Sequence, residues 1–340
     1  MRAQVFYGPG DLRYEEIAVP ETGPGEVRLR IEAALTCGTD VKTLRQGHPV
    51  MIPKLPTVFG HELCGTVDAI GPGVKSVRVG ERAVAANSAP CGACAYCGRG
   101  QPNLCDDLEF VNGAYAEYIV LPARLVACNL VGVPSHIPPA RLAFAEPVAC
   151  CLHALEVVDI RSGDAVLVFG HGAVGLMLGL LAQRAGARVI LAGKTGPRLD
   201  VAARLGFAAC LDISRTADPV GVIRAAAGGG VRCAIDATGR PAAWEHAVAA
   251  VDKGGTVIFF GGCAPGTSIR LDTRRVHYDE LRLLGVFHHT PALIRRAVGL
   301  LASGDFDPTP LITHGMALPD VPEALELMNR GEALKVLIQP

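Results

Sequence analysis

One stretch of the chain limits its fold more than any other: "DAVLVFGHGAVGLMLGLLAQRAGARVILAG", residues 164–193. The short apolar run from Val166 to Phe169 predicts a buried strand, which a glycine-rich turn follows. The next apolar residues fit a helix, and after it a second strand. Later stretches, "RCAIDATG" and "GGTVIFFGG", also predict strands that end in glycine-rich loops. This order predicts an α/β domain with a parallel sheet.

The turn itself has the spacing GxGxxG, with Gly170, Gly172 and Gly175 at its key positions. The first glycine permits a tight turn, the second lets the backbone approach a pyrophosphate, and the third lets helix and strand pack closely. Amides at the start of the following helix can bind the phosphates. A generic strand-to-helix turn is the alternative, but the flanking strands favour a dinucleotide site. The predicted contacts are Gly170, Gly172, Ala173, Val174 and Gly175.

The end of the second predicted strand bears on the choice of cofactor. An NAD site usually has an acid about 20 residues after the glycines, bonded to the ribose hydroxyl. Here no Asp or Glu lies between Gly175 and Asp200. The sequence therefore predicts NADP in preference to NAD, and a solvated basic loop in an NAD enzyme is the alternative. The residues that could bind the 2′-phosphate are Gly193, Lys194, Thr195 and Arg198.

Four cysteines lie within "CGACAYCGRGQPNLC", residues 91–105. Clustered cysteines in a reducing compartment ligate a metal more often than they form disulfides. Four thiolates at this spacing suit a tetrahedral zinc ion with no open position, and incidental buried thiols are the alternative. A closed site of this kind is structural and not catalytic. The four predicted ligands are Cys91, Cys94, Cys97 and Cys105.

A second group of metal-binding residues lies upstream. "EVRLRIEAALTCGTD" alternates apolar and charged residues, which predicts a half-buried strand that leads to Cys37. "TVFGHELCGTVDAIGPGV" places His61 and Glu62 before a second alternating strand. A single cysteine or histidine is usually a core residue. Beside a closed zinc lobe, however, a thiolate, an imidazole and a carboxylate form a mixed ligand set that leaves room for a substrate oxygen.

Composition excludes several classes of protein. The 340 residues suffice for about two domains. Lys plus Arg (32) nearly equals Asp plus Glu (33), so no basic surface for nucleic acid is expected. The N-terminus lacks the apolar run of a signal peptide, and the uncharged stretch 165–183 is broken by four glycines and His171. We therefore expect a soluble, cytoplasmic protein that acts on a small molecule and binds no membrane.

Taken in order, these motifs resemble the zinc-dependent medium-chain dehydrogenases/reductases. The resemblance rests on Cys37-Gly-Thr-Asp, Gly-His61-Glu62, the cysteine lobe, "GAYAEY" and the glycine turn. "AEPVACCLHAL" and the C-terminal "PLITHGMALPDVPEALELMNRGEALKVLIQP" look like the sorbitol and polyol dehydrogenase branch. The resemblance implies a GroES-like, β-rich catalytic domain at 1–152 and 288–340, which includes the zinc lobe 91–105. It implies an inserted Rossmann domain with a doubly wound parallel sheet at 153–287, and an active site in the cleft between the two.

The resemblance also implies an activity: the zinc-dependent oxidation of a secondary alcohol such as a polyol, cyclitol or sugar, or the reverse reduction, with NADP or NAD. One zinc would be catalytic and one structural, and a homodimer or homotetramer is expected. Threonine-dehydrogenase-like oxidation of an amino alcohol, or a general zinc alcohol dehydrogenase, are the alternatives.

Individual roles follow from the same resemblance. Cys37 and His61 would be catalytic zinc ligands, and Glu62 would be a ligand or lie just behind the metal. Asp40 would fix the tautomer of His61, and the Thr39 hydroxyl would lie on the path by which the alcohol proton leaves. Glu146, in "AEP", would be a further ligand, or else only an acid at the start of a helix.

Two positions depart from the family pattern. Lys42 stands where many relatives have the histidine at the outer end of the proton relay, and lysine is a poorer relay at neutral pH. "GVFHH" places His288 and His289 where sorbitol dehydrogenases have Arg-Tyr. The two histidines could contact the substrate or could cap the end of a strand.

Overall fold

The computed structural model describes residues 1–340 and divides into two compact units. Unit 1 comprises Met1–Ala149 and His289–Pro340, and unit 2 comprises Cys150–His288. Helix α5 (Ala145–Glu156) carries the chain from the first to the second. Each unit has its own apolar core.

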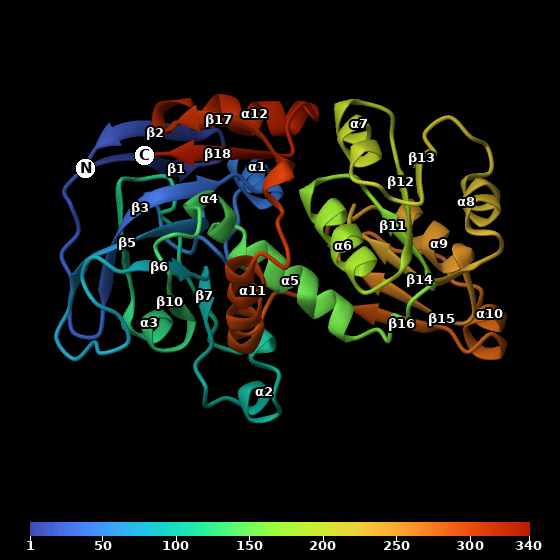
Figure 1. The fold of residues 1–340 in the computed structure, drawn as a ribbon, viewed down its shortest axis with the longest axis horizontal. Helices are drawn as coiled ribbons and strands as arrows, with labels where there is room; N and C mark the ends of the chain where they lie inside the picture. The colour runs from blue at the N-terminus through green and yellow to red at the C-terminus, as the bar shows by residue number, and fades with distance from the viewer. The chain divides into compact units, whose positions relative to one another are not determined.

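Unit 1 is built on a seven-stranded sheet in the order β10-β6-β5-β3-β18-β17, with β9 also paired to β3. Along its central strand β3, buried and more exposed side chains alternate as the sequence predicts: Val27, Leu29 and Ile31 are buried while Arg30 is exposed. In Figure 1 the red strand β18 lies beside the blue strand β3, so both ends of the chain contribute to one sheet. The strands are β3 (Val27–Leu35), β5 (Glu62–Ile70), β6 (Arg82–Ala85), β9 (Tyr118–Leu121), β10 (Leu130–Val133), β17 (Ile312–Ala317) and β18 (Lys335–Gln339).

Smaller elements complete unit 1. A three-stranded sheet contains β1 (Arg2–Gly8), β2 (Asp11–Glu16) and β4 (Thr57–Val58), and a two-stranded sheet pairs β7 (Ser88–Ala89) with β8 (Glu109–Phe110). The α-helices are α1 (Gly38–Gln46), α2 (Ala95–Gly98), α3 (Ala123–Asn129), α4 (Pro139–Leu142), α11 (Pro291–Ser303) and α12 (Val321–Arg330). Three short 3-10 helices are η1 (Pro102–Leu104), η2 (Thr309–Leu311) and η3 (Leu318–Asp320).

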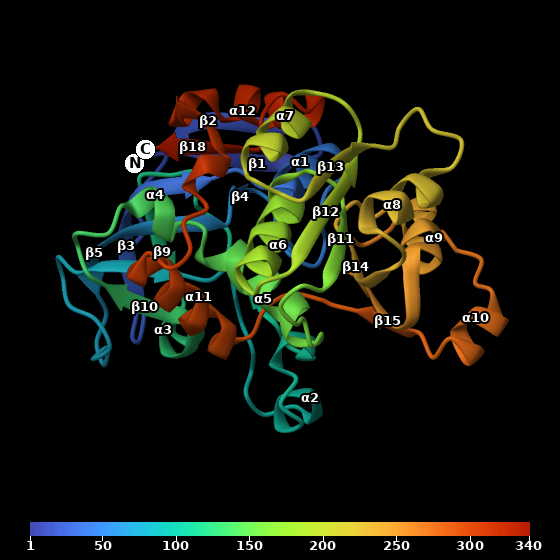
Figure 2. The same cartoon turned by 45° about the vertical axis from the view of Figure 1, so that its right-hand side comes forward.

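Unit 2 is a six-stranded sheet in the order β13-β12-β11-β14-β15-β16, and every pair in it is parallel. Read in chain order this is 3-2-1-4-5-6, the doubly wound arrangement that binds dinucleotides, as predicted. Helix α6 packs on β11 and β12, and α9 packs on β14 and β15 (Figure 2). The strands are β11 (Ala165–Phe169), β12 (Arg188–Gly193), β13 (Ala209–Asp212), β14 (Val231–Asp236), β15 (Val251–Phe259) and β16 (Arg282–Gly285). The helices are α6 (Ala173–Arg184), α7 (Pro197–Arg204), α8 (Pro219–Ala227), α9 (Pro241–Ala250) and α10 (Thr273–Tyr278).

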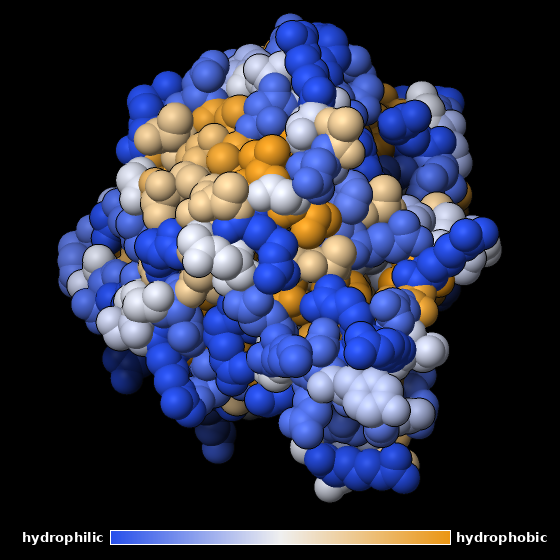
Figure 3. All heavy atoms as spheres, turned by 90° about the vertical axis from the view of Figure 1, so that its right-hand side faces the viewer, coloured by the Kyte–Doolittle hydropathy of each residue, from blue (hydrophilic) through white to orange (hydrophobic).

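Thirteen large hydrophobic side chains are exposed on the surface, among them Val50 and Tyr278. Figure 3 shows hydrophilic residues over most of one face, with hydrophobic residues gathered in a smaller area. The longest helix, α11, has 13 residues, and no helix here combines the length and the apolar character that crossing a bilayer requires.

Candidate active site and cofactor-binding loop

Hydrogen bonds to Thr39 and Asp40 hold Cys37 at the start of α1. It is the N-cap residue, in extended conformation, and its Sγ accepts a hydrogen bond from the amide of Thr39 at 3.4 Å. In return, Oδ2 of Asp40 accepts one from the amide of Cys37 at 2.9 Å. This reciprocal pair is a capping box with sulfur in place of a hydroxyl oxygen. It fixes the thiol at the end of β3, with Thr39 partly buried and Lys42 exposed on the same helix.

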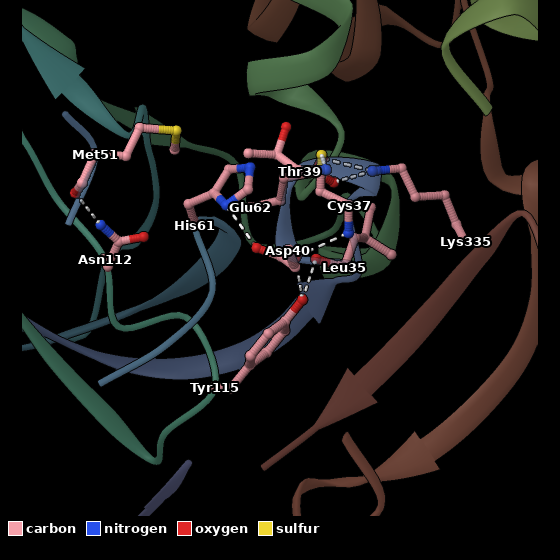
Figure 4. Close-up of polar contacts among 10 residues, drawn as sticks. All are labelled: Leu35, Cys37, Thr39, Asp40, Met51, His61, Glu62, Asn112, Tyr115 and Lys335. Carbon is pink, nitrogen blue, oxygen red and sulfur yellow. Dashed lines mark hydrogen bonds and ion pairs between the residues drawn. The ribbon is translucent and has the colours of Figure 1, made fainter. Parts of the chain in front are cut away.

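Asp40 also orients His61. Its Oδ1 lies 3.0 Å from Nδ1 of His61, and its Oδ2 accepts a 2.5 Å hydrogen bond from the Tyr115 hydroxyl (Figure 4). All three side chains are buried. A carboxylate at Nδ1 keeps a proton on that nitrogen and leaves Nε2 to bind a ligand. Burial opposes charge on both partners, but their attraction outweighs it: the pKa of His61 lies well above its ordinary value and the pKa of Asp40 lies below its own.

Glu62 forms a buried ion pair with Lys335. The lysine Nζ lies 2.5 Å from both carboxylate oxygens, and neither side chain is more than 2% exposed. β3 pairs with β5 on one side and with β18 on the other, and the two residues stand near the ends of those outer strands (Figure 4). Burial opposes charge on Lys335, but Glu62 outweighs it and holds the pKa of the lysine above its ordinary value. The lysine is therefore an ammonium ion at neutral pH.

The structure brings three of the predicted ligands together. One ligand atom each from Cys37, His61 and Glu62 lies within 4.8 Å of the others. Glu146 is outside this group, in the first turn of α5 and 8% exposed. Burial raises the pKa of Glu62 to about 7 against the opposing effect of Lys335, and the charge of Glu146 adds to the rise. The donor set of sulfur, imidazole nitrogen and carboxylate oxygen is one that Zn²⁺ binds, and three donors leave a fourth position for substrate.

The two histidines after "GVF" lie at the end of unit 2 and the return of the chain to unit 1. His289 is buried, and its Nε2 lies 3.0 Å from Oδ1 of Asn87. His288 has a positive φ of 61°, and its carbonyl oxygen lies 2.7 Å from Nδ1 of His153. Their role toward a substrate stays a prediction.

Three residues near this site were not singled out by sequence reasoning. Tyr115 entered only as part of a family motif. His48, whose Nδ1 accepts the amide of Met51 at 3.1 Å, has a pKa lowered by burial and by the nearby His61 ring. Lys335 did leave a signal: it is a lone charge in the apolar run "ALKVLI", where a buried lysine needs an acidic partner.

The four-cysteine lobe has a different construction. Its four sulfur atoms lie within 4.8 Å of one another, around the short helices α2 and η1, and all twelve cysteines of the chain are free thiols. Backbone amides point at the sulfurs: the amide of Cys94 donates to Cys91 at 3.3 Å, and that of Cys91 donates to Cys105 at 3.2 Å. Amides of this kind lower the pKa of Cys91 and Cys94. Burial and a neighbouring thiol raise that of Cys97, as expected where four thiolates need a cation between them.

The glycine turn in unit 2 has the close approaches that its spacing predicts. Gly170 has a φ of +100°, and a Cβ there would lie 2.9 Å from a methyl of Thr238. A Cβ on Gly175 would lie 2.0 Å from the carbonyl oxygen of Gly170, so helix and strand touch backbone to backbone. Gly172 is the N-cap of α6 and has open space around it. Ala173 and Val174 form the first turn of that helix.

The predicted cofactor-selecting residues lie at the end of β12. Gly193 ends the strand, and Lys194 and Thr195 are exposed just after it. Arg198 lies in the first turn of α7, where burial lowers its pKa. Because β11 and β12 are parallel neighbours, this end of β12 and the glycine turn share one edge of the sheet.

Known proteins resemble this chain along its whole length. Residues 23–131 match the alcohol dehydrogenase GroES-like domain, and residues 173–303 match the zinc-binding dehydrogenase domain. D-arabinitol dehydrogenase 1 of Uromyces fabae is 29% identical over 100% of this chain and 97% of its own. L-threonine 3-dehydrogenase of Sinorhizobium medicae is 30% identical over 99% and 98%. A zinc-binding dehydrogenase of Sinorhizobium meliloti, solved with NADP, has a TM-score of 0.89 and 29% identity over 100% and 99%.

The β-rich unit with its thiolate, imidazole and carboxylate cluster, together with a doubly wound nucleotide-binding unit, defines a metal-dependent oxidoreductase. The chain belongs to the zinc-dependent medium-chain dehydrogenases, in the branch of the polyol dehydrogenases. It is an NAD(P)-dependent alcohol or polyol dehydrogenase, as the sequence motifs predict.

Proposed function

We propose that this enzyme oxidises a secondary hydroxyl of a polyol, cyclitol or sugar-like molecule to a ketone, or catalyses the reverse reduction, with NADP preferred over NAD. The observation that carries the substrate class is the cluster of half-buried Cys37 with buried His61 and Glu62, with Glu146 close by. Carboxylate oxygens make such a site harder and more polar than one with a second thiolate. A polar site suits an alcohol flanked by further hydroxyls. The likeness to D-arabinitol dehydrogenase supports the same class.

We assign the catalytic zinc to Cys37, His61 and one carboxylate, from Glu62 or Glu146, and the structural zinc to the four-cysteine lobe. When bound, zinc supplies Lewis-acid polarisation of the alcohol oxygen, and the nicotinamide supplies the hydride acceptor. The sulfur, nitrogen and oxygen donors of the first set and the four sulfurs of the second both fit zinc.

The chain's own residues have defined tasks in this scheme. Asp40 holds the His61 ring with its proton on Nδ1, and Tyr115 and the Cys37 amide hold Asp40. Lys335 neutralises Glu62 and fixes its carboxylate. We assign to Thr39 Oγ1 the acceptance of the alcohol proton as it releases its own toward solvent. Lys42, exposed on the same helix, would be the outer group of that path.

The preference for NADP rests on the end of β12. No acidic side chain stands there to bond a ribose hydroxyl or repel a 2′-phosphate, and Lys194, Thr195 and Arg198 lie beside it. The relative from Sinorhizobium meliloti was solved with NADP. We also propose the domain bounds 1–152 with 288–340, and 153–287, which the two compact units support.

We further propose a cytoplasmic homo-oligomer, a dimer or a tetramer. Twelve free cysteines suit a reducing compartment. Strand β16 is an edge of the unit 2 sheet, with Tyr278 (71% exposed) and Phe287 (54%) on either side of it in the sequence. An apolar strand edge is a common place for a second chain to pair. Light scattering on the purified protein measures the assembly, and a monomer would contradict this proposal.

A second candidate activity is the oxidation of an amino alcohol, because L-threonine 3-dehydrogenases are 30% identical to this chain. One experiment separates the candidates: kcat/KM for a polyol, its deoxy analogue, an alkanol of equal length and threonine, each with both cofactors. We expect the polyol to exceed the alkanol by at least about 100-fold, since sites built to bond a hydroxyl discriminate strongly. An equally efficient alkanol would indicate a general alcohol dehydrogenase, and threonine as the best substrate would indicate the second candidate.

A further inference from the structure

His171 occupies an unusual place in the cofactor-binding unit. It lies between the first two glycines of the turn after β11, and its ring reaches the end of the neighbouring strand β12. There Nε2 lies 3.1 Å from the amide nitrogen of Lys194 and also contacts the carbonyl oxygen of the same residue. Whichever ring nitrogen carries the proton, one of these contacts is a hydrogen bond. The ring is therefore anchored to the backbone.

The anchored ring fills the space that a side chain on Gly193 would need. A Cβ on Gly193 would lie 2.6 Å from Cδ2 of His171, 2.8 Å from Nε2 and 3.1 Å from Cγ. Contacts this short are well inside the optimal separation of about 3.5–4.0 Å between carbon atoms. Any side chain at 193 must displace the imidazole and break its contact with Lys194.

Position 193 is where an NAD-selective site of this fold places its acid. This chain has no carboxylate at that position, and the imidazole of His171 occupies the space that its side chain would need. We propose that His171 sets the cofactor preference jointly with Gly193: its ring excludes an acidic side chain from the end of β12, so that no carboxylate stands there to repel a 2′-phosphate. This inference rests on the NADP preference in the proposed function and names the residue that produces it.

The proposal makes the two positions interdependent. If the missing acid alone decided the preference, Gly193→Asp would convert the site to NAD. If the His171 ring also determines the preference, the new aspartate cannot reach the ribose-binding position until the imidazole is removed. A cycle of Gly193→Asp, His171→Ala and the double variant therefore separates the two cases.

For each variant, the dissociation constants of NADPH and NADH are measured from the fluorescence of the reduced nicotinamide. The full-length, zinc-loaded protein is used, without alcohol. We expect Gly193→Asp alone to weaken NADPH at least about 10-fold and to improve NADH by less than about 3-fold. The double variant should bind NADH at least about 10-fold more tightly than Gly193→Asp, a coupling of about 1.4 kcal/mol. Equal NADH binding by the single and double variants would overturn the proposal.

Thermal unfolding without cofactor provides a second readout. Gly193→Ala should lower the melting temperature, and adding His171→Ala should restore most of the loss. Gly285→Ala is the matched control, because Gly285 ends strand β16 of the same sheet and nothing lies within 4 Å of the place of its Cβ. If Gly193→Ala is as harmless as the control, the ring is not anchored and the proposal fails. A wild-type preference for NADH would instead overturn the proposed NADP preference, while the cycle would still measure the coupling.

Discussion

Unit 1 holds two groups of residues that could each bind a metal ion, and the two groups are built differently. The four-cysteine lobe comes from 15 consecutive residues, none of its sulfurs has a charged side chain as hydrogen-bond partner, and backbone amides surround them. The Cys37 cluster joins the residue that caps α1 to two residues at the start of β5, and charged side chains bind its two buried members, Asp40 to His61 and Lys335 of β18 to Glu62. The lobe offers four donors, which would close a tetrahedral zinc site, whereas the Cys37 cluster offers three and would leave a fourth position open.

The difference predicts that loss of a metal ligand has opposite effects on the stability of the fold in the two groups. A lobe without a large apolar core depends on its metal for its fold. The Cys37 cluster sits in a sheet whose apolar core is independent of metal, so loss of one ligand leaves the framework standing. Loss of a residue from one of the charged pairs around the cluster should destabilise the fold, because it leaves the other charge buried without a partner.

The largest effect is expected for Cys37→Ser compared with Cys97→Ser. Cys37→Ser should lower kcat/KM at least about 1000-fold and leave the melting temperature nearly unchanged, because it removes a ligand and not a support. Cys97→Ser should lower the melting temperature by several degrees and reduce the zinc content from two to one. In domains of this size about 1 kcal/mol shifts the melting temperature by about 2–4 °C.

Elemental analysis measures the zinc content, steady-state kinetics measures kcat/KM, and calorimetry measures the melting temperature of each variant. Cys128→Ser, at a half-buried thiol of α3 that belongs to neither group, is the control. Exchange of the two phenotypes would mean that the catalytic and structural sites are assigned the wrong way round.

The features that could be predicted from the sequence lie within single segments of the chain, and those that could not are contacts between residues far apart in the sequence. The strand, glycine turn and helix of unit 2 follow from short-range periodicity, and the parallel sheet confirms the fold class. The lobe follows from spacing within one segment. The pair Glu62–Lys335 joins residues 273 apart in the sequence, and only the pairing of β18 with β3 brings them together. The missing acid at Gly193 was visible in the sequence, but the ring of His171 that fills its space was not.

The next largest effect is expected for Lys335→Met, which leaves Glu62 buried without its ammonium partner. The free energy of unfolding should fall by about 3 kcal/mol. The double variant Glu62→Gln/Lys335→Met removes the stranded charge and should recover more than half of the loss. Denaturant unfolding measures both, with the exposed Lys194→Met as the control. A single variant as stable as the wild type would show that the pair contributes nothing to the fold.

The smallest effect is expected for Tyr115→Phe, which removes one hydrogen bond from Asp40 and keeps the ring. The phenyl group would still pack against Gly60 and keep the edge contact with Phe59, whose ring centroid is 6.0 Å away. Asp40 would then be held by His61 and the Cys37 amide alone, so the His61 ring would be less firmly oriented toward the metal. Loss of such an outer partner typically weakens metal binding by about 10- to 100-fold, and we expect the lower end because Asp40 keeps two partners. Competition with a chelator measures the loss, with Tyr118→Phe in the same "GAYAEY" motif as control. The lobe zinc should be unaffected, and equal weakening of both zinc ions would show that the substitution acts on the fold of unit 1 instead of on His61.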